Sequence, residues 1–356
     1  MKEKLRIAIS GLGNRALPKN AEDSNWLGWV ELIRRSDFFQ LVAVHDVSEQ
    51  SLQRIVETGC LKPDCTYQDI DLMLNSVNCN AILISNPAEY HASTIRKALE
   101  CDLHVLAEKP FVKSTIEGKE LTGLIEKKDK IVAIVQNWRS KDVGGALYRA
   151  IQGGVVGKIG SIYFRYIRDR ENPNYPSYIF DEPYPLLYAM GIHHLDLFRY
   201  ILKDEFLCVS GNSFKPPWSL YEFDTGLNLF YRMKSGVTIN YTGTISSKNR
   251  MILQESLIID GEKGTLFNES QWLEPPLWFY PQGKQERVNL TKEIKDTSIS
   301  NQYNKSDNYV LENFYQAILN REEPLCNAMD GLRSVVILEA SRLACETGKE
   351  IKVDNF

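Results

Sequence analysis

Residues 5–16 read LRIAISGLGNRA, an apolar run that leads directly into two closely spaced glycines. The first six residues have the length and composition of a buried β-strand. Gly11 and Gly13 then form a G-x-G-x-x-A pattern, in which glycine permits a tight turn and lets the backbone approach a pyrophosphate at the start of a helix. The stretch therefore predicts a strand, turn and helix that open a dinucleotide-binding domain. The alternative is a glycine turn capped by an unrelated loop.

The rest of the first third of the chain alternates in the same way. Short apolar runs at 5–10, 40–45, 81–85, 103–107 and 131–136 are separated by helix-like stretches near 26–36, 49–58, 69–76, 91–101 and 115–128. Strands that are almost continuously Val, Ile and Leu, with helices between them, indicate a parallel sheet covered on both faces. We expect residues 1–137 to form a doubly wound α/β domain of the Rossmann type.

The pattern changes after about residue 138. One helix-like stretch at 142–153 is followed by the runs 161–168, 225–233, 237–245 and 255–261, several of which alternate apolar and polar residues. Such alternation is typical of an antiparallel sheet with one packed face, which leaves the other face for solvent or a partner subunit. We expect residues 138–356 to form an α+β domain with a large, mostly antiparallel sheet. Its helices should lie at 185–202 and near 329–347, and the last could pack back on the first domain.

The composition excludes several classes of protein. With 356 residues, 43% hydrophobic and 25% charged, the chain should fold into two globular domains. A net charge of −4 argues against a nucleic-acid or anionic-membrane partner. The longest apolar stretch, at 185–202, is broken by charged residues and cannot span a membrane. The seven scattered Cys lack zinc or redox spacing, which predicts reduced cytoplasmic thiols and no metal site. The N-terminal stretch MKEKLRIAIS leads from charged residues directly into a short strand-like run, which does not fit a signal peptide.

Asp46 ends the second predicted strand, where its carboxylate could accept hydrogen bonds from the adenosine ribose hydroxyls. It lies 35 residues after Gly11 rather than the usual ~20, so residues 17–30 look like an insertion that could fold over the cofactor. A carboxylate here would repel a 2′-phosphate and favours NAD. Arg15, which we expect to line the site together with Asn14, leaves NADP open.

The apolar run at 103–107 ends in Glu108, Lys109 and Pro110. The carboxyl end of a strand is the edge of a parallel sheet at which ligands bind. Lys109 is therefore either a functional group or a solvated charge at the end of a strand.

At this point the sequence resembles a family, the Gfo/Idh/MocA oxidoreductases of sugars and cyclitols. The motifs that carry the resemblance are Gly11-x-Gly13, Asn86-Pro87-x-x-x-His91 with the later Glu108-Lys109-Pro110, and Gly191-Ile192-His193-His194-Leu195-Asp196. Their order and spacing match over nearly the whole chain. The Glu-Lys-Pro element with its upstream Pro-x-x-x-His is far more specific than the glycine turn.

The resemblance implies that Lys109 reaches both the nicotinamide ribose and the reacting carbinol, and that Pro110 fixes its presentation through a cis peptide bond. A partly desolvated Lys beside the oxidised cofactor would have a lowered pKa and could relay the hydroxyl proton. Glu108 would position the loop or pair with a cation. Asn86 and Pro87 would lie against the nicotinamide end. His91 would either contact the cofactor or cap a helix.

The catalytic His of the family matches His193, which would serve as a general acid or base. A buried structural histidine is the alternative for His193 and also for His194. The family carries Asp four residues before this His, whereas this chain has Ala189. The proton relay of the family therefore does not transfer intact. The residues that could supply a substitute from the preceding loop are Tyr184, Tyr188, Asp181 and Glu182.

Weaker candidates complete the predicted site. Asn137 should lie near the cofactor, and Arg139 near the substrate, because both follow the last strand of the first domain. Arg165 could bind an acidic group or be a solvated charge on a strand. Tyr178 could stack on a sugar, and His194 could also touch the substrate.

The overall hypothesis is an NAD-dependent oxidoreductase that moves a hydride between nicotinamide and a secondary hydroxyl of a sugar, glycoside or cyclitol. Lys109 and His193 would manage the proton. The free face of the antiparallel sheet should make a homodimer or homotetramer. The alternatives are a glycoside-cleaving enzyme that uses transient oxidation, and a non-catalytic nucleotide-binding sensor or scaffold.

Overall fold

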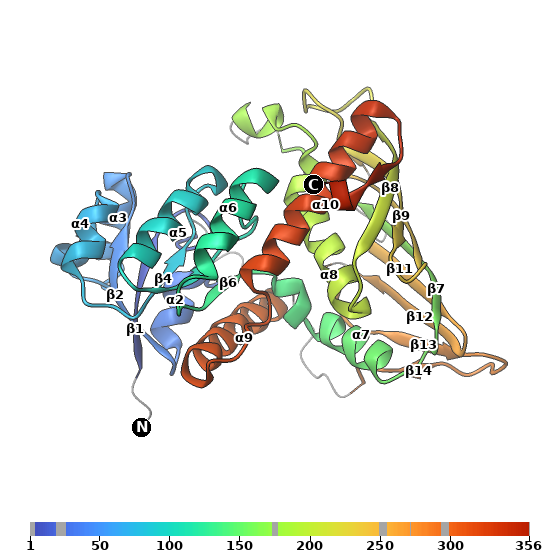
Figure 1. The fold of residues 1–356 in the computed structure, drawn as a ribbon, viewed down its shortest axis with the longest axis horizontal. Helices are drawn as coiled ribbons and strands as arrows, with labels where there is room; N and C mark the ends of the chain where they lie inside the picture. The colour runs from blue at the N-terminus through green and yellow to red at the C-terminus, as the bar shows by residue number, and fades with distance from the viewer. Residues whose placement is uncertain are drawn as a thin grey trace. The chain divides into compact units, whose positions relative to one another are not determined.

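The computed structural model describes residues 4–18, 26–172, 177–248, 255–270, 272–292 and 299–355, without the side chains of 177–178 and 299–303. The predictions for residues 19–25 of the insertion and for the side chain of Tyr178 lie outside this description. The chain divides into two compact units, Met1–Ser140 with Ser300–Val335, and Lys141–Ile299 with Val336–Phe356 (Figure 1). Each is described by itself.

The first unit contains a six-stranded parallel sheet in the order β3-β2-β1-β4-β5-β6. Its strands are β1 (Leu5–Ser10), β2 (Phe39–His45), β3 (Thr66–Tyr67), β4 (Ala81–Ile84), β5 (His104–Ala107) and β6 (Val132–Ile134). All five neighbouring pairs run parallel, which confirms the doubly wound prediction. The pattern did not predict β3, because two residues are too few to show a period.

Helices cover both faces of this sheet (Figure 1). They are α2 (Gly28–Arg35), α3 (Glu49–Glu57), α4 (Ile70–Ser76), α5 (His91–Glu100), α6 (Thr115–Ile125) and α9 (Ile299–Asn320). Polar caps begin three of them, since the side chains of Ser48, Asp69 and Ser114 accept backbone N–H groups at the first turns of α3, α4 and α6.

Helix α9 was not predicted, and it brings residues 300–335 into the first unit, whereas the sequence assigned them to the second domain. Its apolar side chains join α2, α3 and one face of the sheet in a single core. Phe314, for example, stacks on Phe39 of β2 with ring centroids 5.9 Å apart. The sequence pattern could not show this because the two rings are far apart along the chain.

The second unit contains a nine-stranded sheet in the order β14-β13-β12-β11-β7-β10-β9-β8-β15. The strands are β7 (Ile159–Ile167), β8 (Phe206–Phe214), β9 (Gly226–Met233), β10 (Thr238–Thr244), β11 (Glu255–Gly261), β12 (Gly264–Ser270), β13 (Trp278–Pro281), β14 (Val288–Asn289) and β15 (Ile351–Lys352). Among these described strands, only β7 and β10 pair in parallel, so the prediction of a mostly antiparallel sheet is confirmed.

Helices α7 (Asp142–Gln152) and α8 (Ile192–Leu202), with the C-terminal half of α10 (Ala328–Thr347), lie on one face of this sheet (Figure 1). On β7, Phe164 and Tyr166 are buried under these helices, whereas Tyr163 is 46% exposed on the opposite face. The shorter helical turns are η1 (Pro63–Cys65), η2 (Ala88–Tyr90), η3 (Asn137–Ser140), η4 (Ser177–Asp181), η6 (Val353–Asn355) and the π-helical segment η5 (Leu187–Gly191). In the described part of the chain, none of the helices has the length and apolar content that crossing a membrane requires.

Candidate functional site

A cavity of about 980 Å³ opens at the carboxyl ends of β1, β2 and β4 in the first unit. The predicted cofactor residues that line it are Gly11, Gly13, Asn14, Arg15, Asp46, Asn86 and Pro87. The carboxyl ends of parallel strands share one edge of the sheet, so residues from separate parts of the sequence meet there. The structure therefore brings most of the predicted dinucleotide residues to one cavity.

The two glycines of the turn act differently. Gly11 has φ +93°, and a Cβ on it would lie 2.4 Å from the backbone nitrogen of Asn86. Only glycine lets the turn after β1 approach the end of β4 this closely. A Cβ on Gly13 would meet nothing within 4 Å, so glycine there leaves room above the turn. These features fit a dinucleotide whose pyrophosphate lies against the backbone.

Asp46 is fixed at the end of β2 by two backbone N–H groups. Leu12 donates to Oδ2 at 2.6 Å, and Ser48 donates to Oδ1 at 2.8 Å. Each carboxylate oxygen can accept a further hydrogen bond, so the carboxylate can also receive ribose hydroxyls. At the rim of the same cavity, Lys97 pairs with Asp71 at 2.6 Å.

Arg15 is directed toward two carboxylates. Its Nε donates to Glu108 at 2.6 Å, and its two terminal nitrogens donate to Asp307 at 2.9 and 3.2 Å. Its guanidinium also lies over the rings of Trp26 and Trp29, 5.3 and 4.9 Å from their centroids. Of the two partners of Arg15, Glu108 follows β5 and Asp307 belongs to α9. Asp46 is not one of these partners and follows β2.

The ion pair between Arg15 and Glu108 keeps the guanidinium protonated and the carboxylate ionised. Burial alone would lower the pKa of Arg15, but Asp307 and Glu108 hold it above its ordinary value. Burial alone would raise the pKa of Glu108, but Arg15 and the indole N–H of Trp29 hold it below its ordinary value. The ion pair is therefore charged throughout the neutral pH range.

The segment around Lys109 is bounded by buried groups. Glu108 is 6% exposed, Lys109 is half-buried, and the Lys109–Pro110 bond is cis, as the resemblance implies. The His91 ring is buried between two backbone carbonyls, with Nδ1 2.7 Å from the oxygen of Pro110 and Nε2 3.0 Å from that of Asn86. His91 thus links the Asn-Pro segment to the Glu-Lys-Pro segment through its ring.

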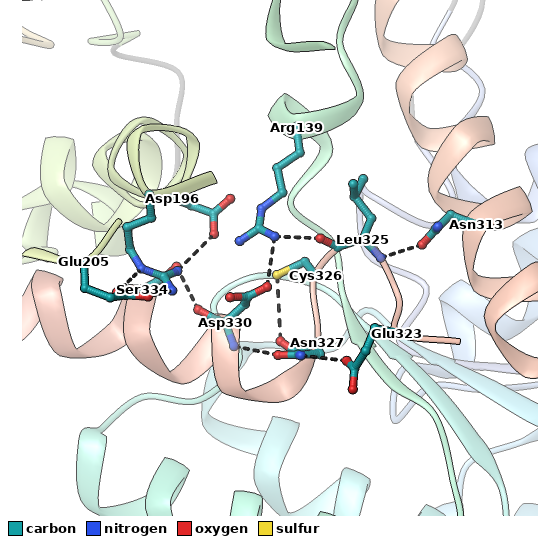
Figure 2. Close-up of polar contacts among 11 residues, drawn as sticks. Arg139, Asp196, Glu205, Asn313, Glu323, Leu325, Cys326, Asn327, Asp330 and Ser334 are labelled. Carbon is teal, nitrogen blue, oxygen red and sulfur yellow. Dashed lines mark hydrogen bonds and ion pairs between the residues drawn. The ribbon is translucent and has the colours of Figure 1, made fainter. Parts of the chain in front are cut away.

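Asn137 and Arg139, which follow β6, are both buried in the first unit. The amide of Asn137 donates to Asp307 at 2.9 Å. Figure 2 shows Arg139 directed at the Leu325 carbonyl and at Asp330, with distances of 2.6 and 3.0 Å. The guanidinium of Arg139 thus binds Leu325, between α9 and α10, and Asp330 in the first turn of α10, which does not support the predicted contact with a substrate.

His193 lies in the first turn of α8, where it is 9% exposed. The preceding segment, which contains Ala189, is π-helical. In an α-helix the residue four positions before His193 would share its face, but this rule does not hold strictly for a π-helix. Of the proposed substitutes, Tyr188 lies near Arg342 of α10, and burial raises its pKa. Asp181 and Glu182 are exposed.

The structure places His194 in the core of the second unit. It is completely buried, its ring centroid lies 4.6 Å from that of Phe164, and its Nδ1 is 2.9 Å from the hydroxyl of Tyr241. Burial holds the pKa of His194 well below its ordinary value. This position matches the structural alternative for His194, because the aromatic side chains of the sheet cover the ring, and the contact with substrate stays a prediction.

Arg165 lies on the opposite face of the sheet from the buried Phe164 and Tyr166, 3.4 Å from Glu269 of β12. Its side chain is 42% exposed, which matches the interpretation as a strand-face charge. Asp307 is the residue that sequence reasoning missed. No local motif marks it, since its role depends on α9 packing beside the glycine turn.

Known proteins match the chain along most of its length. The family described as "Oxidoreductase family, NAD-binding Rossmann fold" matches residues 5–136, and its C-terminal alpha/beta domain matches residues 148–353. An uncharacterised oxidoreductase of Schizosaccharomyces pombe is 32% identical over 136 residues, which is 36% of each chain. A D-apiose dehydrogenase of Paraburkholderia graminis is 21% identical over 91% of this chain and 85% of its own.

Solved structures share the fold. An oxidoreductase from Agrobacterium radiobacter, crystallised with NAD+, L-tartaric acid and magnesium, superposes with a TM-score of 0.85. The two chains are 15% identical, and the match covers 99% of each. At this identity the likeness concerns the fold alone.

Proposed function

Because the chain belongs to the Gfo/Idh/MocA family of oxidoreductases, we propose that it is an NAD-dependent dehydrogenase of a secondary hydroxyl in a sugar, glycoside or cyclitol. The observation that carries the proposal is the carboxyl edge of the six-stranded sheet. There the glycine turn follows β1, Asp46 follows β2, and Lys109 follows β5. The D-apiose dehydrogenase among the relatives supports a sugar as the substrate class.

The residues that would hold NAD line the cavity of the first unit. Gly11 and Gly13 offer backbone to the pyrophosphate, Asp46 accepts from the ribose hydroxyls, and Asn86 with Pro87 borders the nicotinamide end. NAD, when bound, supplies the hydride acceptor. The negative charge of Asp46 would repel a 2′-phosphate, and the pairing of Arg15 with Glu108 and Asp307 also favours NAD over NADP.

Proton handling falls to Lys109 and His193, on the basis of the family resemblance. A hydroxyl that loses hydride from its carbon must also lose its own proton. Lys109 is half-buried next to Glu108, which pairs with Arg15 at 2.6 Å, and we assign the uptake of the hydroxyl proton to its amine. Ala189 supplies no acid, so we propose that His193 acts here without the Asp of the family.

The proposed assembly is a homodimer or homotetramer formed through the open face of the nine-stranded sheet. Tyr163 is 46% exposed on that face, and Phe230, Ile258 and Phe267 are half-buried on neighbouring strands. An apolar face of this kind is stabilised when a second subunit covers it. A cytoplasmic location remains part of the same proposal.

The test is mass spectrometry of a panel of sugars, glucosides and inositols after incubation with the protein and NAD. We expect one compound to lose two hydrogens while NADH appears in equal amount. A glycoside cleaved without net NADH would replace the dehydrogenase with an enzyme that uses transient oxidation. A panel left unchanged by protein that binds NAD would contradict the proposal and favour a nucleotide-binding sensor.

A further inference from the structure

The backbone around Lys109 is held from both sides. On the N-terminal side, the Glu108 carboxylate receives Arg15 Nε at 2.6 Å and the Trp29 indole N–H at 2.8 Å. On the C-terminal side, the Pro110 carbonyl lies 2.7 Å from Nδ1 of His91. The position of Lys109 therefore depends on side chains that belong to other elements of the first unit.

Asp307 is the residue of α9 that completes this arrangement. Both of its carboxylate oxygens receive Arg15, one at each terminal nitrogen, and Oδ1 also receives the amide of Asn137 at 2.9 Å. Its side chain is 1% exposed. A bidentate contact with a carboxylate fixes the plane of a guanidinium as well as its position.

The charges explain why the arrangement needs both carboxylates. Arg15 borders the dinucleotide cavity, so its guanidinium has a second direction in which it could turn, toward the cofactor phosphates. Asp307 holds the two terminal nitrogens, which leaves Nε directed at Glu108. Without Arg15, the buried Glu108 would lose its direct ion pair.

We propose that Asp307 is a positioning residue of the dinucleotide site, which turns Arg15 toward Glu108 and thereby fixes the segment that carries Lys109. The effect of Asp307 on catalysis rests on the proposed function, whereas its effect on the position of Lys109 does not depend on that function.

The first experiment compares Asp307→Asn with Asp330→Asn. Asp330 is the control, because it also pairs with an arginine of the first unit, Arg139 at 3.0 Å, outside the Lys109 segment (Figure 2). We expect kcat to fall about tenfold or more in Asp307→Asn, because a small displacement of a reacting group is costly. The Kd for NAD should stay within about threefold of wild type. Asp330→Asn should lose stability while keeping kcat, and Asp307→Glu should recover part of kcat.

A double-mutant cycle tests the route through Arg15. If Asp307 acts by orienting Arg15, adding Asp307→Asn to Arg15→Gln should lower kcat little further, because the two residues share one effect. Additive losses in kcat would show that Asp307 acts independently of Arg15 and would overturn the proposal.

A measurement without substrate separates this inference from the proposed function. Acetic anhydride labelling followed by peptide mass spectrometry gives the reaction rate of Lys109 relative to the exposed Lys113. We expect this ratio to rise about threefold in Asp307→Asn as the segment loosens, and to stay constant in Asp330→Asn. If the Lys109/Lys113 labelling ratio rises in Asp307→Asn but the protein oxidises no compound, the inference about Asp307 is supported and the proposed dehydrogenase activity is contradicted. Equal Lys109/Lys113 labelling ratios in Asp307→Asn and Asp330→Asn would overturn the inference about Asp307 without bearing on the proposed function.

Discussion

The Nε atom of Arg15 lies 2.6 Å from Oε1 of Glu108, although 93 positions separate the two residues in the chain. One residue belongs to the glycine turn after β1, and the other precedes the lysine that the family resemblance assigns to catalysis. The contact thus ties the turn expected to hold pyrophosphate to the segment expected to carry out proton transfer.

Replacing Arg15 with Ala should lower the free energy of unfolding by about 3 kcal/mol at pH 7, because two buried carboxylates lose their common cation. In the wild type the pKa of Glu108 is held below its ordinary value of 4.5, so the pair stabilises the fold above that pH, and its contribution is lost as the pH falls through the lowered pKa. The difference between variant and wild type should therefore shrink below about pH 4.5. Urea unfolding at several pH values measures it. Arg34→Ala, which breaks an exposed pair with Glu31, is the control and should change stability far less.

Gly11→Ala and Gly13→Ala should separate folding from cofactor binding. A Cβ on Gly11 meets the Asn86 backbone at 2.4 Å with φ at +93°, so we expect a loss of at least about 2 kcal/mol in stability. A Cβ on Gly13 points into open space, so the variant should keep its melting temperature but bind NAD about tenfold more weakly. Thermal melts and calorimetric titration with NAD give the two results. Equal loss of stability in both variants would contradict the assignment of separate roles.

Asp46→Asn should shift nucleotide preference. The amide keeps an oxygen for the Leu12 N–H but lacks the charge that repels a 2′-phosphate, so the ratio of the NADP and NAD affinities should rise at least about tenfold. Asp71→Asn is the control, because it removes a charge from the same cavity that is already paired with Lys97. If both variants change the ratio equally, Asp46 has no special place beside the ribose.

Lys109→Ala should abolish turnover while the Kd for NAD stays within about tenfold of wild type, since one polar contact is lost. Initial rates with the substrate found in the panel, together with NAD titration, provide the measurement. Lys113→Ala, four positions further on and exposed, should retain wild-type rates. Persistent turnover in Lys109→Ala would remove this residue from the proposed mechanism.

His194→Gln should lower stability without altering KM, because the ring is buried among Phe164, Tyr166 and Tyr241. Its pKa is depressed in the folded protein, so the unfolded chain binds the extra proton. Wild-type stability should therefore fall as the pH drops below about 6.5, and the variant should lose this part of the pH dependence. A raised KM with unchanged melting temperature would instead place His194 at the substrate.

Much of the fold and part of the site could be predicted from local patterns. The strand-and-helix alternation placed β1, β2, β4, β5 and β6, and the glycine turn, Asp46 and Asn86 meet at one cavity because they follow strands of one parallel sheet. The same reasoning could not find Asp307, which has no motif around it. It also could not decide whether His194 faced a ligand or a core, since both alternatives fit one helical position.

The sequence by itself determined the alternation of elements, the glycine turn and the identity of the reactive groups, because these depend on residues within a few positions of each other. Only the tertiary structure decided where those groups point. Arg15 turns to Glu108 and Asp307, α9 joins the first unit, and aromatic rings of the second unit enclose His194. Each of these outcomes is a contact between distant segments, whose free energy arises from burial and charge pairing that no single stretch of sequence contains.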